Sequence, residues 1–255
     1  AGDKPLSKEK NRRQGRLPRE KKLPQNIKLP QLLLLSLIAA LSAFLIYLAY
    51  PRLHASLLYL PVDTAINRFH DSGEVNHAQL LGLQQRAEES IGIQDHYRYH
   101  DGLSLLYYLQ AIDRQRPLYE RRGAFEQSIE AAQASLDQAP AQPRTWLRIA
   151  QARSWLRYPP EQVIDALAMS IYTGRVEPSL LLIRLKLGLA YLARMDSEAT
   201  SLLRDQMVLA WQMQPRGITR ALKAGTLRIA PVQTLLKETH PLVLQEIEAA
   251  DGNSR

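Results

Sequence analysis

The sequence predicts an all-α protein in which an N-terminal transmembrane helix precedes an α-solenoid of helical hairpins. Three observations support this fold class. An uncharged apolar run occupies residues 31–50. Beyond it, apolar residues recur at the three- and four-residue spacing of helices, and no stretch alternates long enough to predict a strand. Segments rich in proline and glycine interrupt the helical pattern at regular intervals.

The first 30 residues are basic and lack apolar periodicity. They carry ten Lys and Arg against three Asp and Glu, whereas the rest of the chain is nearly neutral, with 23 basic and 22 acidic residues. Because the excess charge lies outside the part expected to fold, the sequence does not predict the basic stripe of a nucleic-acid-binding protein. We therefore predict a disordered cytoplasmic tail over residues 1–30 and no nucleic-acid partner.

Residues 31–50, QLLLLSLIAALSAFLIYLAY, are long enough as a helix to cross a hydrocarbon layer of about 30 Å. A cleaved signal peptide is the alternative. However, the candidate cleavage points after Ala49 and Ala55 have Tyr47 and Leu53 where small residues are required. The positive residues before the run orient the N-terminus toward the cytoplasm. The sequence thus predicts a single-pass protein of a bacterial inner membrane, with most of the chain in the periplasm.

The remainder is expected to form a helical connector, residues 51–94, and a helical repeat domain, residues 95–255. Helix breaks are predicted at Gly73, at Pro117, and within residues 138–143, 158–160, 176–178 and 214–217. The apolar segment 180–193 is a candidate second span. It is only about 14 residues long and contains Arg184 and Lys186, which favours a buried soluble helix.

The breaks recur with a period that indicates paired helices. Pro140 and Pro178 are 38 residues apart, and Pro178 and Pro215 are 37 apart. A period of this size that holds two helices is typical of helical-hairpin repeats. Gly188 lies inside such a helix, where glycine costs about 1 kcal/mol relative to alanine. We expect it to allow a close approach of the paired helix, with Ala150 in the same role one repeat earlier.

These positions resemble the tetratricopeptide family, whose pattern asks for a large residue, then Leu-Gly, then Tyr, and a closing proline. The matching residues are Trp146, Ile149 and Ala150 in one repeat, and Leu187, Gly188 and Tyr191 in the next. The resemblance implies repeats at residues 141–177 and 178–215, a degenerate one from about 95 to 140, and an atypical helix pair at the end. Arg184 departs from the pattern, because it replaces the large apolar residue.

The chain offers no constellation typical of catalysis. It has no cysteine, and it lacks the glycine-rich, nucleophile-elbow and HExxH motifs of nucleotide-binding proteins, hydrolases and zinc proteases. His96 and His100 stand four residues apart, but two histidines with this spacing are weak evidence for a metal site. We read them as part of a solvated first helical turn in which Tyr97 or Tyr99 packs. The sequence therefore predicts no enzyme, cofactor or metal.

A protein-binding face is predicted from the repeat register, because the first helices of stacked hairpins line a concave surface. The expected groove residues are Arg144, Leu147, Gln151, Ser154 and Trp155 in one repeat, and Leu182, Leu185, Leu189 and Leu192 in the next. Arginine and tryptophan beside an apolar stripe are typical of protein-binding hot spots. The alternative is that the chain's own terminal helices cover this stripe.

A narrower resemblance covers roughly residues 55–240. The Trp that opens a repeat, the Glu-Pro before the leucine-rich helix, the late QPRG and the YLPVDTAINRF after the anchor are similar to the VpsP-like group, which is associated with bacterial exopolysaccharide synthesis. This implies a membrane-anchored periplasmic scaffold that contacts other membrane or periplasmic proteins, among them polysaccharide synthase or export components. The alternative is a periplasmic chaperone or translocon-associated tetratricopeptide protein. The sequence does not indicate an oligomeric state.

Overall fold

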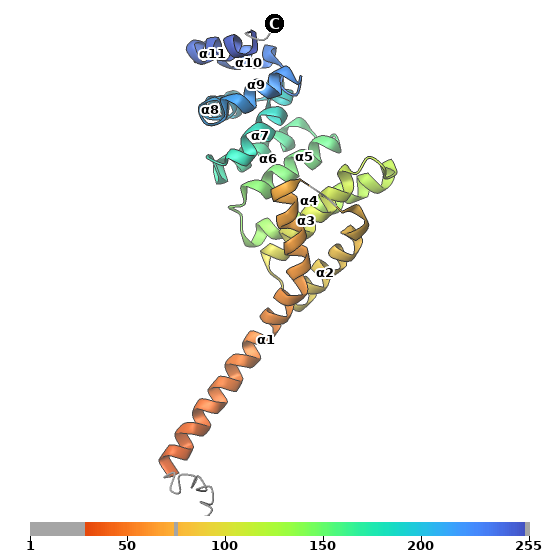
Figure 1. Ribbon diagram of the computed structural model, residues 1–255, viewed down its shortest axis with the longest axis vertical. Helices are drawn as coiled ribbons and strands as arrows, with labels where there is room; N and C mark the ends of the chain where they lie inside the picture. Colours follow the sequence, from red (N-terminus) through yellow and green to blue (C-terminus); the bar gives the residue numbers. More distant parts are fainter. Residues whose placement is uncertain (1–28, 74–75, 253–255) are drawn as a thin grey trace, which may run out of the picture. The chain divides into compact units, whose positions relative to one another are not determined.

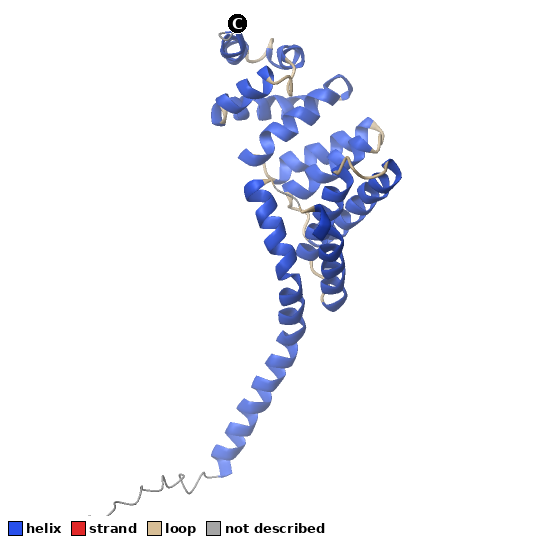
Figure 2. Ribbon diagram, turned by 45° about the vertical axis from the view of Figure 1, so that its right-hand side comes forward, coloured by secondary structure: helices blue, strands red, loops and turns tan. Residues whose placement is uncertain are grey.

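The computed structural model describes residues 29–73 and 76–252, so residues 1–28 of the predicted basic tail lie outside it. Figures 1 and 2 show helices joined by turns, and no strand is present within these two ranges. The chain divides into two units, one that ends at Leu48 and one that begins at Ala49. The predicted all-α class is therefore confirmed for the described residues.

The first unit holds the beginning of α1, Leu29–Ser72. The side chains of residues 29–48 are exposed, and within the described residues α1 alone is long and apolar enough to cross a membrane. The predicted span thus corresponds to a helix of suitable length and composition. Its orientation and the identity of the membrane stay predictions.

The helix does not end where the apolar run ends. It continues through Pro51 and Pro61 to Ser72, so the first part of the predicted connector belongs to α1. Each proline lacks the N–H that would donate to the carbonyl four residues earlier, which weakens the helix at these two points. Beyond Leu48, within the second unit, α1 buries Ala55, Tyr59 and Val62 against α2 and α3, and this packing stabilises the helix past both prolines.

The second unit continues with short and medium-length helices. In chain order these are η1 (His77–Gln79), α2 (Leu80–Ile93), α3 (Tyr97–Ile112), α4 (Leu118–Gln138), α5 (Pro143–Trp155), α6 (Pro160–Thr173), α7 (Pro178–Tyr191), η2 (Leu192–Arg194), α8 (Ser197–Met213), α9 (Pro215–Lys223), α10 (Ile229–Leu236) and α11 (Pro241–Gly252). The helices α5, α6, α7 and α9 each begin with a proline, whose fixed φ suits the first helical turn. The predicted breaks are therefore confirmed at these boundaries, and segment 180–193 is a partly buried helix of the second unit.

Three consecutive antiparallel hairpins, α3/α4, α5/α6 and α7/α8, occupy the three predicted repeats. In each one, a polar side chain at the end of the second helix donates a hydrogen bond to the first carbonyl of the first helix. The bonds join Ser135 Oγ to Tyr97 O (2.9 Å), Ser170 Oγ to Pro143 O (2.7 Å) and Gln214 Nε2 to Pro178 O (2.9 Å). The hairpins are thus shown, whereas their membership of the tetratricopeptide class stays a prediction.

Apolar clusters join each hairpin to the next. One cluster holds the part of α1 beyond Leu48 against α2 and α3, a second joins α3, α4 and α5, a third joins α4 to α7, and the largest joins α7 to α8–α11. Gly188 of α7 faces Leu203 of α8, and a Cβ at this position would lie 2.4 Å from Leu203 Cδ1. The predicted close approach at Gly188 is therefore confirmed.

Arg184 is fully buried between α6, α7 and α8. Its guanidinium donates to Ser170 Oγ (3.0 Å), Gly174 O (2.9 Å) and Gln206 Oε1 (3.1 Å), and also to the Ser170 carbonyl. Burial lowers the pKa of Arg184 to about 10. Because the carbonyl end of a helix carries partial negative charge, the positive charge of Arg184 neutralises the end of α6. The tetratricopeptide pattern has a large apolar residue at this position.

Candidate functional site

The predicted groove is not an open surface. Leu147, Leu185 and Leu189 are only 2%, 0% and 9% exposed, so the expectation that they line an accessible face is wrong. Leu185 and Leu189 belong to the cluster that α8–α11 complete, and Leu182 and Leu192 pack against the same cluster. For this stripe the structure shows the alternative, namely cover by the chain's own terminal helices. The physical reason is that neighbouring helices pack against α7 on two sides. The apolar spacing of α7 alone does not reveal how many of its sides are covered.

The polar members of the predicted face lie apart from this cluster. Arg144 is exposed at the start of α5, and its Nη2 donates to Ser179 Oγ at the start of α7 (3.1 Å). Gln151 is half-buried, and Ser154 Oγ accepts a hydrogen bond from Tyr191 Oη (3.0 Å). Leu147 instead packs in the cluster of α4–α7. The structure therefore distributes the predicted residues over several environments, and whether Arg144 and Gln151 contact a partner stays a prediction.

Trp155 lies in a stacked arrangement near the end of α5. Its ring centroid is 4.4 Å from that of the buried Phe125, and the Arg121 guanidinium carbon lies 5.0 Å from the Trp155 ring. Arg121 is held in place because its Nε donates to Ala111 O (2.8 Å). Trp155 is consequently part of the packing between α4 and α5, and only part of its ring reaches the surface.

A hollow of about 630 Å³ opens where the ring reaches the surface. We call it the Trp155 hollow; it is lined by Leu118, Arg122, Trp155, Leu156 and Arg157. Leu118 is 68% exposed, and the neighbouring Tyr119 is 75% exposed. The hollow thus combines apolar surface with two arginine side chains at the turns of consecutive hairpins.

Arg157 adopts an unusual backbone conformation at the end of α5. Its φ is +59°, in the left-handed region that favours glycine, and the N–H of Tyr158 closes the helix end on Arg153 O (3.0 Å). A residue with a Cβ costs roughly 1–2 kcal/mol there. Arg122 pairs with Glu126 (3.2 Å), whereas Arg157 makes no ion pair within residues 29–73 and 76–252.

A second candidate site lies between the part of α1 beyond Leu48 and the start of α3. We call it the Tyr99 cleft; it measures about 630 Å³ and is lined by Arg52, Ser56, Tyr59, Leu60 and Asp63 of α1, together with Gln94, His96, Arg98 and Tyr99. The rings of Tyr59 and Tyr99 pack with centroids 4.7 Å apart, and His96 lies 5.6 Å from Tyr99. This aromatic layer forms the base of the cleft.

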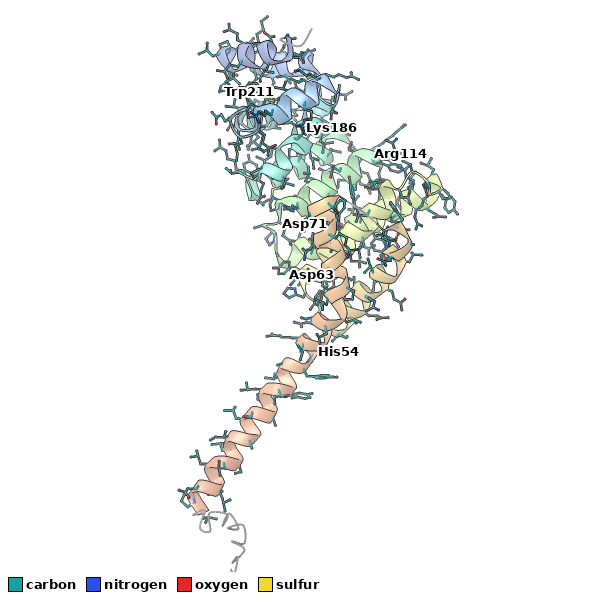
Figure 3. The ribbon with its side chains drawn as sticks, viewed as in Figure 1. His54, Asp63, Asp71, Arg114, Lys186 and Trp211 are labelled. Atoms are coloured by element: carbon teal, nitrogen blue, oxygen red, sulfur yellow. The ribbon has the colours of Figure 1, made fainter. Side chains whose placement is uncertain are left out.

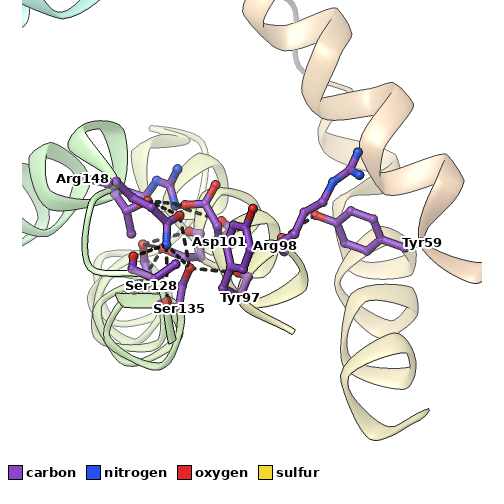
Figure 4. Close-up of polar contacts among 11 residues, drawn as sticks. Tyr59, Tyr97, Arg98, Asp101, Ser128, Ser135 and Arg148 are labelled. Atoms are coloured by element: carbon purple, nitrogen blue, oxygen red, sulfur yellow. Dashed lines mark hydrogen bonds and ion pairs between the residues drawn. The ribbon is translucent and has the colours of Figure 1, made fainter. Parts of the chain in front are cut away.

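Tyr59 is the best-fixed residue of the cleft. It is 3% exposed, and its hydroxyl donates to Arg98 O (3.2 Å) over the face of Gly102 (Figure 4). Burial, and secondarily the charge of Asp101, raise the pKa of Tyr59 well above its ordinary value. The phenol therefore stays protonated and acts as a structural donor.

The rim of the cleft is polar. Arg98 Nη2 pairs with Asp63 Oδ1 at 2.5 Å, and this ion pair joins α3 to α1. Asp63 is labelled in Figure 3. Ser56 Oγ and Tyr99 Oη are 3.2 Å apart. Arg52, by contrast, makes no hydrogen bond or ion pair with its side chain within the part of the chain that the structure describes.

On the other side of the α3 start, a polar network connects α3, α4 and α5 (Figure 4). Arg148 Nη1 lies 3.0 Å from Asp101 Oδ1, and the Thr145 hydroxyl donates to the same carboxylate oxygen (2.5 Å). Ser104 and Ser128 join α3 to α4 through reciprocal hydroxyl-to-carbonyl bonds of 2.8 and 2.9 Å. These groups are partnered by one another, so the network positions the three helices relative to each other.

The two histidines weighed as metal ligands have other partners. His96 caps α3, since its Nδ1 accepts the Arg98 N–H (3.2 Å), and His100 Nε2 lies 2.7 Å from Asp95 Oδ1. Hydrogen bonds from His100 and Gln138 lower the pKa of Asp95. No group of three or more potential metal-ligating side chains was found among the described residues. Tyr99 packs in the first turn of α3, as expected.

Comparison with known proteins identifies no relative. No family model matches the chain, and no curated protein or solved structure is significantly similar to it. The candidate sites therefore depend on the residues and contacts described above.

The Tyr99 cleft was missed by sequence reasoning, although part of its signal is visible there. Arg52, Ser56, Tyr59 and Asp63 recur at four- and three-residue spacing and so share one face of a helix. Their partners come from residues 94–99, which no local pattern connects with α1. The predicted division between the transmembrane helix, residues 31–50, and the connector, residues 51–94, also hid the continuity of α1 through this face.

Proposed function

We propose that this chain is a membrane-anchored adaptor with its bulk in the periplasm, where it organises an exopolysaccharide synthesis or secretion complex through protein–protein contacts. The membrane anchor is supported by the length and composition of the start of α1. The choice of machinery rests on the sequence resemblance to the VpsP-like group. The adaptor role is supported by the hairpins, which resemble tetratricopeptide repeats in period and helix pairing.

The Trp155 hollow is the observation that carries the adaptor role. It places exposed Leu118 and Tyr119 beside the Trp155 edge and the side chains of Arg122 and Arg157. Tryptophan and arginine in a partly desolvated pocket are the residues that dominate protein interfaces. By charge complementarity, the hollow fits a partner segment that carries acidic and apolar side chains.

The conformation of Arg157 supports the same conclusion. Glycine would occupy this left-handed position at lower cost, yet the chain has an arginine whose side chain lines the hollow. Backbone strain of this kind is commonly retained at functional sites. We infer that Arg157 is kept for its side chain.

The orientation is tested by fusing reporters after residue 255. We expect an alkaline phosphatase fusion to be active and a fluorescent protein that folds only in the cytoplasm to be dark, because the positive residues before the apolar run favour a cytoplasmic N-terminus. Neutral substitutions of the ten basic residues in the tail should weaken this preference. The opposite reporter pattern would refute the periplasmic placement.

The adaptor role is tested with Arg157→Gly. This change removes one charge from the Trp155 hollow and relieves the left-handed backbone, so we expect partner recovery in mild detergent to fall about tenfold. The same variant should unfold at an equal or higher temperature, because roughly 1 kcal/mol of strain is removed. Co-purification followed by mass spectrometry, and circular dichroism melts of the same preparations, measure the two effects.

Lys186→Gln is the matched control, because it removes one positive charge from an exposed position on α7 (Figure 3). It should leave partner recovery unchanged. Undiminished recovery with Arg157→Gly would exclude the Trp155 hollow as the docking surface. The identity of the recovered proteins separates glycan synthase or export components from a translocon and its clients, and an anionic glycan in place of protein would contradict the adaptor role.

A further inference from the structure

The Tyr99 cleft has an uneven distribution of charge along α1. Arg52 stands at one end and Asp63 at the other, roughly 16 Å apart along the helix axis at 1.5 Å per residue. Asp63 is neutralised by Arg98, whereas Arg52 has no partner within the described residues. The end of the cleft at Arg52 is therefore positively charged and has no anion of its own.

Hydrogen-bond donors line the same cleft as Arg52. The hydroxyls of Ser56 and Tyr99 form one hydrogen bond with each other. Because each hydroxyl carries one hydrogen and the bond uses only one of the two, the other remains available to a ligand. His96 uses Nδ1 as an acceptor for the Arg98 N–H, so its Nε2 carries the hydrogen of the neutral ring. An arginine together with hydroxyl and imidazole donors is suited to a phosphate oxygen.

The same part of α1 exposes apolar side chains. Leu53, Leu57 and Leu60 are 59%, 59% and 57% exposed, and their four- and three-residue spacing places them on one side of the helix. Leu60 also lines the cleft. A leucine stripe beside a cationic cleft is the combination expected for a ligand with an anionic head and an apolar body.

The place of the cleft in the sequence identifies that ligand. Arg52 follows the last residue of the apolar run, Tyr50, by only two positions. Tyr50 packs on His54 with ring centroids 5.8 Å apart, and tyrosine is enriched at the headgroup level of membranes. If the run crosses the bilayer, Arg52 reaches the layer of lipid phosphates.

We propose that the Tyr99 cleft binds the phosphate headgroup of a membrane phospholipid. Arg52 contacts the phosphate, the Ser56 and Tyr99 hydroxyls donate to it, and Leu53 and Leu57 contact the glycerol and acyl region. Asp63 and Arg98 close the far end of the cleft and hold α1 on α3. The bound lipid then orders the second unit at the membrane surface. This inference depends on the membrane span but not on the adaptor role.

The test uses the full-length protein in a mild detergent, with phosphatidylglycerol, an uncharged diacylglycerol glycolipid or inorganic phosphate added at equal concentration. We expect phosphatidylglycerol alone to raise the unfolding temperature, by about 5 °C at a hundredfold excess over its dissociation constant. Native mass spectrometry should detect one retained phospholipid. Arg52→Gln should reduce both effects at least about fivefold, and its circular dichroism spectrum should be unchanged because Arg52 is exposed.

Arg68→Gln is the matched control, since Arg68 lies on α1 but does not line the Tyr99 cleft. It should respond to phosphatidylglycerol like the unmodified chain. The proposal is overturned if Arg52→Gln responds equally, if the glycolipid has the same effect, or if inorganic phosphate suffices, which would indicate a free-anion site. Partner recovery by Arg52→Gln should be normal, so failure here is distinguishable from failure of the adaptor role.

Discussion

Replacing Gly102 with alanine is expected to detach the part of α1 beyond Leu48 from α3. A Cβ on Gly102 would lie 1.7 Å from Tyr59 Oη, 2.9 Å from Tyr59 Cζ and 3.0 Å from Ile66 Cδ1. Tyr59 is buried in the cluster that joins α1 to α2 and α3, and its hydroxyl is bound to Arg98 O. The ring therefore cannot turn away without losing both its packing and its hydrogen bond. Overpacking commonly costs 1–3 kcal/mol, and we expect about 3 kcal/mol or more here.

The effect is measured by chemical unfolding of the full-length protein in mild detergent and by the rate of protease cleavage within residues 49–72. Gly92→Ala is the matched control, because Gly92 is a helical glycine of α2 at which an added methyl group would meet no atom within 4 Å. It should be neutral or stabilising by about 1 kcal/mol. Tyr59→Phe should partly rescue Gly102→Ala, since it removes the atom in the closest contact. Equal behaviour of Gly102→Ala and Gly92→Ala would refute the packing of Tyr59 on Gly102.

Gly188→Leu is expected to separate α7 from α8 and to destabilise the second unit by about 3 kcal/mol or more. A Cβ on Gly188 would meet Leu203 Cδ1 at 2.4 Å, Cδ2 at 3.0 Å and Cγ at 3.2 Å, and Leu203 is itself fully buried. A larger side chain has no space between the two helices. Thermal unfolding followed by circular dichroism measures the loss.

The sequence and the structure give different expectations for the stability of Gly188→Ala. By analogy with Ala150, alanine would be nearly neutral at this position. The contact with Leu203 indicates instead a cost of about 1 kcal/mol, because the overpacking exceeds the gain in helix propensity. Leu203→Val should reduce that cost, so the two changes should be less than additive in a double-mutant cycle. If Gly188→Leu is harmless, the pairing of α7 with α8 is wrong.

Much of the fold follows from local signals. The uncharged run over residues 31–50 predicts a helix long enough to span a membrane, because length and hydropathy are properties of the segment alone. The helix breaks predicted at residues 138–143, 158–160, 176–178 and 214–217 each contain a proline, which suits the first turn of a helix and disrupts its interior. The three expected repeats each contain one hairpin for the same reason. Gly188 indicates a close contact between helices, because glycine among good helix formers lowers helix stability unless close packing compensates for it.

The sites required the tertiary structure. Repeat register placed Leu185 and Leu189 on an open face, but α8–α11 cover them, and helical spacing does not say how many sides of a helix are packed. Trp155 was predicted to line the groove, whereas its stacking on Phe125 depends on how α4 meets α5. Gly102 had no distinguishing local pattern, because its partner Tyr59 lies 43 residues earlier in the chain.

The sequence by itself therefore determined the helical class, the candidate membrane span and several of the breaks between helices. These depend on composition and on interactions within a few turns of chain. Only the tertiary structure decided which apolar faces are covered, which arginine is buried on the end of α6, and that α1 and the start of α3 enclose the Tyr99 cleft. Those features arise from contacts between residues far apart in the chain, whose pairing is selected by the packing of the whole unit and is not encoded in any single segment.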